Sequence, residues 1–127
     1  MNMQRWHIYI LSLGLALTFV AMAVKAFISP DEISDVIANS VIFKNILDKV
    51  PIQLIGIHDA IIGIFIAFRV LPKLINTWAV IWIGTVIILL LSSMNISGLL
   101  DAIEHAAPLG IALYLSINAF TSQKGNS

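Results

Sequence analysis

The chain alternates between long apolar segments and short polar connections. The apolar segments cover about residues 7–28, 52–71, 75–94 and 100–120. A membrane core about 30 Å thick requires about 20 apolar residues of helix to cross it, and each segment has that length. Because lipid offers no hydrogen-bonding partners, a spanning segment must be helical even where β-branched residues are frequent. The pattern predicts an all-α fold, in which four transmembrane helices form an antiparallel bundle and one domain over residues 1–127.

One connection is much longer than the others and covers about residues 31–50. Its apolar residues recur at roughly helical spacing between charged and amide side chains. They are Ile33, Val36, Ile37, Val41, Phe43, Ile46, Leu47 and Val50. We expect one or two short amphipathic helices here, lying on the membrane surface or capping the bundle, with a solvated loop as the alternative.

The composition agrees with a membrane protein and excludes several kinds of chemistry. Hydrophobic residues make up 59% of the chain and charged residues 11%, whereas about 25% of a soluble domain is charged. The net charge is zero and no basic stretch occurs, which argues against nucleic-acid binding. The chain has no cysteine, so disulfides, thiolate metal sites, iron–sulfur clusters and Cys-based catalysis are excluded.

The distribution of basic residues gives an expected orientation in the membrane. With the N-terminus inside, the inner side carries Arg5, Arg69, Lys73 and Lys124, and the outer side carries Lys25, Lys44 and Lys49. The positive-inside rule therefore favours both termini inside. We expect an integral protein of a bacterial or archaeal cell membrane with this N-in, C-in topology.

Five titratable residues lie within the apolar segments, where ionisable groups are costly and often mark function. They are Lys25, His58, Asp59, Glu104 and His105. In an antiparallel bundle, the end of the first helix and the starts of the second and fourth lie on the same side of the membrane. The five side chains are therefore expected to converge in one polar pocket in the outer half of the bundle.

Each of these residues also has a purely structural interpretation. Lys25 can extend to the headgroups or pair with Asp59 or Glu104. Asp59 is too short to reach the surface, so it must be paired, hydrogen-bonded or protonated. Glu104 is expected in the first turn of its helix, where the helix dipole favours a carboxylate. His58 and His105 are each compatible with a hydrogen-bonded interior histidine.

Three kinds of ligand are conceivable for such a pocket. His58, His105 and a carboxylate could bind a divalent metal, but neighbours such as His58 and Asp59 point about 100° apart on a helix and rarely reach one ion. Two histidines could ligate a haem, although no further feature supports this. A lipid-soluble ligand such as a quinone, exchanging protons with histidine and carboxylate, fits the depth of the residues best. We therefore predict no metal site.

Tryptophans and small residues suggest how the helices meet the membrane and each other. Trp6, Trp78 and Trp82 are predicted to be interfacial anchors. Small residues form one face of the second helix, at Gly56, Ala60, Gly63 and Ala67, and a step on the fourth, at Ala106 and Gly110. Such faces allow close approach of helices, either within the bundle or across a homodimer seam.

The segments LSLGLALTFVAMAVKAFISP, GIHDAIIGIFIAFRVLPK and DAIEHAAPLGIALYL resemble helices of the DoxX-like family of small four-helix membrane proteins. The resemblance covers about residues 7–120 and includes Lys25 before Pro30, and Asp59 followed by Gly63. The chain differs where the family often has an Arg-Asp pair entering the last helix. The resemblance implies an association with membrane redox systems, which in this family include a quinone-reducing thiosulfate oxidoreductase.

These observations lead to one expected function and two alternatives. We expect an accessory subunit or partner of a membrane oxidoreductase, with Asp59 and His58 exchanging protons with the ligand and Lys25 as counter-charge. No G-x-S-x-G, phosphate-loop or H-E-x-x-H signature points to a stand-alone enzyme. The first alternative is a non-catalytic scaffold that recruits a larger protein. The second is a small transporter, although the sequence shows no inverted repeat and predicts no broken helix.

Overall fold

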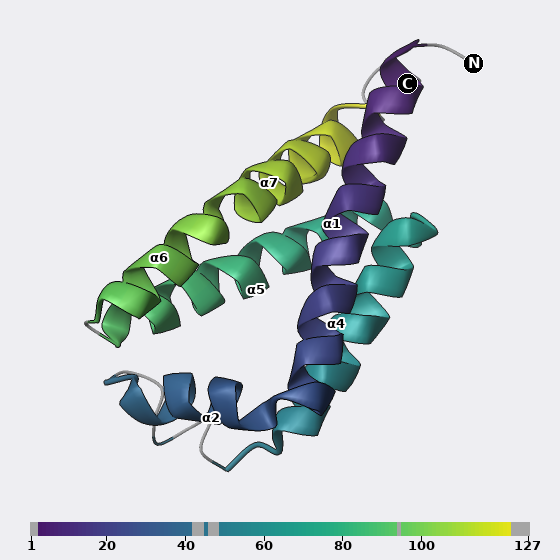
Figure 1. Ribbon diagram of the computed structural model, residues 1–127. Coiled ribbons are helices and arrows are strands. Elements are labelled where there is room, and N and C mark those ends of the chain that lie inside the picture. Colours follow the sequence, from purple (N-terminus) through teal and green to yellow (C-terminus); the bar gives the residue numbers. More distant parts are fainter. Residues whose placement is uncertain (1–2, 42–44, 46–48, 94, 123–127) are drawn as a thin grey trace.

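A computed structural model describes residues 3–41, 45, 49–93 and 95–122. These residues form helices and connections, with no strand among them, so the prediction of an all-α fold is confirmed. The helices are α1 (Met3–Ile28), α2 (Pro30–Asn39), α4 (Ile52–Ala67), α5 (Pro72–Ser92), α6 (Ile96–Glu104) and α7 (Ala106–Thr121) (Figure 1).

Three helical stretches are long and apolar enough to cross a membrane, namely Arg5–Ile28, Pro72–Ser92 and Ile96–Thr121. The fourth expected span is shorter than predicted, because α4 has 16 residues and ends at Ala67. Arg69 and Leu71 adopt positive φ values of 54° and 45°, a left-handed backbone that an α-helix cannot contain. Pro72 then starts α5, since proline is favourable in the first turn of a helix.

The helices form two antiparallel pairs that diverge from one another (Figure 1). Helix α1 lies along α4, and α5 lies along α7. The pairs meet in the half of the bundle that contains both chain termini, which we call the terminal half, and separate in the other, which we call the cavity half. Between them lies an apolar core of Leu15, Ala16, Phe19, Ile62, Ile66, Ile75, Ala79, Ile83, Ala112 and Leu115.

Glycines bring α1 and α4 into close contact. A Cβ atom on Gly56 would lie 2.9 Å from the Ala26 Cβ, and one on Gly63 would lie 3.1 Å from the Ala16 carbonyl oxygen. The small-residue face of α4 therefore packs within the chain, which is one of the two interpretations offered above. On α7, by contrast, a Cβ on Gly110 would have no heavy atom of the described neighbours within 4 Å.

The last apolar segment is not the continuous helix that we expected over residues 100–120. It begins at Ile96 and is interrupted at His105, between α6 and α7, where the backbone keeps right-handed helical angles. Pro108 explains the break, because it has no N–H to donate to the Glu104 carbonyl and its ring clashes with that group. The interruption is confined to one residue, and Ile96–Thr121 remains one apolar helical stretch of 26 residues.

Helix α2 crosses the cavity half between the two pairs (Figure 1). Pro30 begins it and Asp31 and Glu32 occupy its first turn, where the helix dipole favours acids. At its end, the Ser40 and Ser92 hydroxyl oxygens lie 2.8 Å apart and connect the end of α2 to α5. The first part of the expected amphipathic segment is thus a helix, while residues 42–44 and 46–48 lie outside the described residues.

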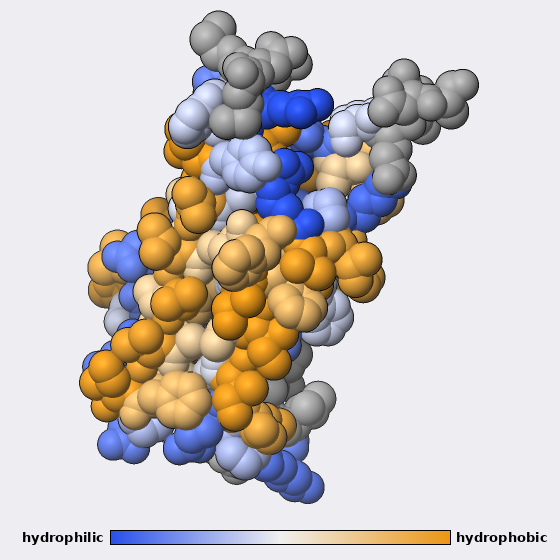
Figure 2. All heavy atoms as spheres, turned by 90° about the vertical axis from the view of Figure 1, so that its right-hand side faces the viewer, coloured by the Kyte–Doolittle hydropathy of each residue, from blue (hydrophilic) through white to orange (hydrophobic). Residues whose placement is uncertain are grey.

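The surface is apolar around the middle of the bundle. Figure 2 shows, on one face, a broad band of hydrophobic residues with hydrophilic ones gathered toward the two ends. Large apolar side chains such as Leu17, Ile28 and Phe68 are exposed on this surface. A continuous apolar band of this kind is unusual on a soluble monomer. Together with the three candidate spans, it is compatible with a membrane protein.

Candidate functional site

A cavity of about 680 Å³ lies where the two helix pairs separate. The six described helices all contribute to its wall, among them α2, which crosses the cavity half. Its apolar lining includes Met22, Ile33, Ile37, Ile55, Trp82, Val86 and Leu89. The volume falls within the range of about 300–1,000 Å³ that is typical of small-molecule sites.

The structure brings four of the five predicted site residues to this cavity. Lys25, Asp59, Glu104 and His105 line it, from α1, α4, the end of α6 and the break before α7. They meet because α1 ends, and α4 and α6 begin, in the cavity half. His58 is not among the lining residues. Its side chain contacts Asp59 and Trp78 of α5.

Asp59 is the most deeply buried polar group at the cavity, with 2% of its surface exposed. Its Oδ1 lies 3.1 Å from Nδ1 of His58, and its Oδ2 has no partner among the described residues. Within the described chain, no fully buried polar side-chain atom lacks a hydrogen-bond partner. Oδ2 must therefore be open to the cavity, where it can accept a hydrogen bond.

The hydrogen bonds of His58 determine which of its ring nitrogens carries the proton. Trp78 Nε1 lies 2.8 Å from His58 Nε2, and the indole N–H can only donate. Nε2 is therefore the acceptor, so the neutral ring has its proton on Nδ1 and donates it to Asp59. The His58 ring also packs against Trp82, with centroids 4.5 Å apart. His58 is thus held on three sides and orients the Asp59 carboxylate.

His105 places a second acceptor at the cavity. Its Nδ1 lies 2.7 Å from the Asp101 carbonyl oxygen, which can only accept, so Nδ1 donates. In the neutral ring, Nε2 is then an acceptor, and it has no partner in the described part of the chain. The interruption of the helix positions this side chain, because His105 is the C-cap of α6 and also the N-cap of α7.

The two remaining residues differ from expectation. Lys25 pairs with Glu32 on α2, with Nζ and Oε2 2.8 Å apart, instead of with Asp59 or Glu104. Both side chains are at least half exposed, at 50% and 63%, so this ion pair contributes little to stability. Glu104 is the last residue of α6. The expectation that it lies in a favourable first turn is therefore wrong, because the helix starts at Ile96.

Sequence reasoning missed the role of two tryptophans. Trp78 and Trp82 were expected to be interfacial anchors, but Trp78 donates to His58 and Trp82 lines the cavity. Their spacing of four residues places them on the same helix face, and that face meets His58. Only the packing of α4 against α5 shows this. Trp6 is exposed near the start of α1, where an anchor is expected.

Two further observations bear on the identity of the site. Among the described residues, no three His, Asp or Glu side chains are grouped so that they could hold a metal ion. Comparison of the chain with models of protein families, with characterised proteins and with solved structures gives no match. The functional argument must therefore rest on the geometry of the cavity.

Proposed function

We propose that this chain is a DoxX-like four-span membrane protein that binds a quinone-type ligand, in its quinol form, in the cavity between the helix pairs. It would act as an accessory subunit or partner of a membrane oxidoreductase. The observation that supports this proposal is a largely apolar cavity of about 680 Å³ with Asp59 Oδ2 and His105 Nε2 at its wall, two acceptors that have no partner among the described residues.

The proposal of four spans requires that α4 crosses the membrane with 16 residues. At 1.5 Å per residue this helix is about 24 Å long, a few Å less than the hydrocarbon core. A short helix is accommodated by local thinning of the bilayer. Since α4 lies along α1, which has the full length, the two helices would cross together.

The chemistry of the acceptors favours the quinol over the quinone. A quinol carries two hydroxyl groups that donate hydrogen bonds, whereas quinone oxygens only accept them. The Asp59 Oδ2 and His105 Nε2 atoms both accept in the neutral-histidine form described above. The ring would lie against apolar side chains and the indole of Trp82. In this proposal, Asp59 and His105 accept the protons that the ligand releases on oxidation by the partner protein.

His58 has a different part from the one that we first expected. Because Trp78 donates to its Nε2, His58 cannot take up a second proton without losing that hydrogen bond. It therefore positions Asp59 instead of exchanging protons itself. The proton-exchanging groups of the proposal are Asp59 and His105.

Quenching of tryptophan fluorescence tests the proposal directly, because quinones quench indole emission and Trp82 lines the cavity. With decylubiquinone as the quenching probe and decylubiquinol as its competitor, we expect saturable quenching of purified wild type and its reversal by excess decylubiquinol. The saturable part should be lost in Trp82→Phe. Trp6→Phe is the matched control, since Trp6 is exposed at the far end of α1. Equal saturable quenching in both variants, or none in wild type, would rule out this binding site.

Asp59→Asn separates ligand binding from folding. The Asn side-chain oxygen can still accept from His58, but an N–H₂ group replaces the acceptor that faces the cavity. We expect affinity for decylubiquinol to fall roughly tenfold, the value of one hydrogen bond to a charged group, with little change in thermal stability. A stability loss with unchanged quinol affinity would favour a structural role.

A scaffold function remains the second candidate, because one small-residue step is not covered by the described helices. Ala106 and Gly110 are exposed on α7, and space is open around Gly110. A helix of another protein could pack there closely. Gly110→Leu would then abolish co-purification of the partner while leaving decylubiquinol binding unchanged.

A transporter function also gains one supporting observation. The one-residue interruption at His105 lies beside the cavity, and interrupted helices beside polar sites are typical of transporters. Uptake of a labelled substrate into liposomes containing the protein, lost in Pro108→Ala, would favour this function over an accessory role.

A further inference from the structure

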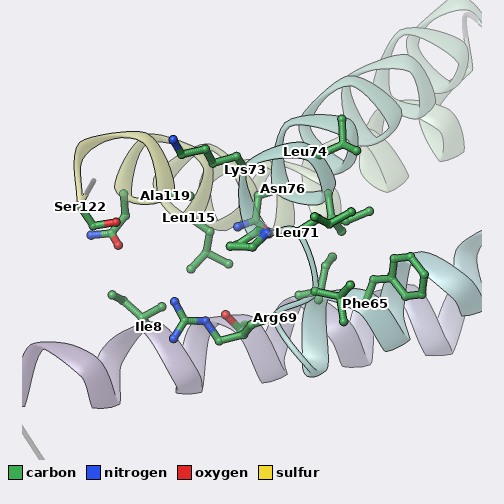
Figure 3. A pocket seen from close by; sticks show the side chains of 16 residues that line it. Ile8, Phe65, Arg69, Leu71, Lys73, Leu74, Asn76, Leu115, Ala119 and Ser122 are labelled. Carbon is green, nitrogen blue, oxygen red and sulfur yellow. The ribbon is translucent and has the colours of Figure 1, made fainter. Parts of the chain in front are cut away.

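A second pocket, of about 300 Å³, lies in the terminal half of the bundle. It is formed where the turn between α4 and α5 approaches α1 and the end of α7 (Figure 3). Figure 3 shows Arg69 reaching along α1 toward Ile8, with Ser122 and Ala119 of α7 across the hollow. None of the proposed quinol-binding residues line this pocket.

The described lining of this pocket is positively charged. Arg69 and Lys73 belong to it, and no carboxylate is among the lining residues that the structure describes. Each cation lies over an aromatic ring, since the Arg69 guanidinium is 5.0 Å from the Tyr9 centroid and the Lys73 ammonium is 5.4 Å from that of Phe120. The contact with Tyr9 holds the Arg69 guanidinium in place without neutralising its charge.

Two polar side chains at the pocket lack protein partners. The Arg69 guanidinium has no hydrogen bond or ion pair to any described residue, although it carries five N–H donors. Asn76 is 7% exposed, and its amide has no partner in the same part of the chain. No fully buried polar side-chain atom among the described residues lacks a partner. The unpaired Asn76 amide is therefore not fully buried, and it is accessible from the pocket that Asn76 lines.

We propose that this pocket binds a phosphate group, with Arg69 as the bidentate ligand and Lys73 and Asn76 as further donors. Guanidinium groups match the geometry of phosphate oxygens. Leu74, in the first turn of α5, also lines the pocket, and N–H groups in the first turn of a helix favour anions. Asn118 of α7 and Ser122, which caps the end of α7, supply additional polar atoms.

The phosphate could belong to a lipid headgroup or be free in solution. The pocket lies at an end of the bundle where exposed apolar side chains such as Phe68, Leu71 and Leu74 surround it. Basic pockets between transmembrane helices on the cytoplasmic side commonly bind anionic headgroups. The experiment therefore uses both sources as separate probes.

Thermal unfolding of the purified protein in detergent distinguishes these cases. We expect dioleoylphosphatidylglycerol to raise the Tm of wild type, and dioleoylglycerol, which has the same tails and no phosphate, to have no effect. Inorganic phosphate is the second probe, with sodium chloride at equal ionic strength as its control. A Tm shift with the lipid identifies a headgroup, and a shift with inorganic phosphate identifies a free anion. Either result supports the phosphate site.

Matched variants show where the phosphate binds. Arg69→Gln should weaken binding of the active probe roughly tenfold, whereas Arg5→Gln removes the same charge from an exposed residue at the same end and should have no effect. Asn76→Leu should weaken binding without lowering the Tm of the probe-free protein, since its amide has no partner to lose. The proposal is overturned by equal responses of Arg69→Gln and Arg5→Gln, or by no shift with either probe.

Discussion

In the terminal half of the bundle the helices meet in an apolar core, whereas in the cavity half the same helices separate around polar groups. The core residues Leu15 and Leu115 have 0% and 2% of their surface exposed. In the cavity half, Lys25 and Glu104 remain exposed, and Asp59 is buried, with only His58 as its partner among the described residues. The terminal half contains the packed apolar core, and the cavity half contains hydrogen-bond acceptors that have no partner among the described residues.

The two halves differ because of a few local features. Gly56 and Gly63 keep α1 and α4 together throughout their length. Pro108 interrupts the last segment, and α2 lies between the separated helix pairs and lines the cavity. A tightly packed half and an open half can therefore coexist in one small bundle. The following predictions test this contrast, from the largest expected effect to the smallest.

Truncation of the core should have the largest effect on stability. Leu15 is 0% exposed and Leu17 is 67% exposed on the same helix. Leu15→Ala should lower the free energy of unfolding by about 2–5 kcal/mol, because it leaves a cavity that the surrounding helices cannot fill. Leu17→Ala is the control and should change it by less than about 1 kcal/mol. Similar losses for both, measured by chemical denaturation in detergent, would mean that the core is loosely packed.

Overpacking between α1 and α4 should be nearly as costly. A Cβ on Gly63 already lies within 3.1 Å of a backbone oxygen, so Gly63→Val should destabilise the protein by about 1–3 kcal/mol. Gly110→Val, on the uncovered face of α7, is the matched control. If thermal unfolding showed the same loss in both variants, the loss would come from helix propensity and not from helix contact.

Removal of the helix break should affect the cavity half alone. Pro108→Ala restores the N–H that can bond to the Glu104 carbonyl, so α6 and α7 can join. We expect a higher Tm. We also expect loss of decylubiquinol binding, because the His105 side chain would change its orientation relative to the cavity. Circular dichroism and the quenching titration check the two effects. Unchanged binding together with increased helix content would show that the break does not shape the cavity.

Loss of the indole donor should have a smaller effect, about 1 kcal/mol, the value of one neutral hydrogen bond. Trp78→Phe keeps an aromatic ring but leaves His58 Nε2 without its donor, so the histidine can change tautomer. We expect a shift of the His58 ring ¹⁵N resonances toward the Nε2–H form and weaker quinol binding. Unchanged ¹⁵N resonances would contradict the assignment of the proton to Nδ1.

The ion pair between Lys25 and Glu32 should have the smallest effect. Both side chains are largely exposed, so Glu32→Gln should change the stability by less than about 1 kcal/mol, and less still at high salt. A loss of several kcal/mol in thermal unfolding at low salt would show that α2 depends on this pair to cover the cavity.

The sequence alone determined the helical content and the membrane-length apolar segments. This was possible because unbroken apolar length is a local property, and lipid forces such segments to be helical. It also indicated that Lys25, Asp59, Glu104 and His105 lie at similar heights, because chain reversal at each connection determines the order of helix ends. The start of the last segment was misjudged, so Glu104 was placed in the wrong turn.

Only the tertiary structure decided which side chains meet. The contact of Trp78 with His58, the choice of Glu32 as partner for Lys25, and the open oxygen of Asp59 all depend on how helices rotate about their axes. Helical periodicity defines the faces of one helix but not which face of a neighbour they meet. The cavity and the basic pocket arise from that pairing, because each is formed by residues from helices far apart in the sequence.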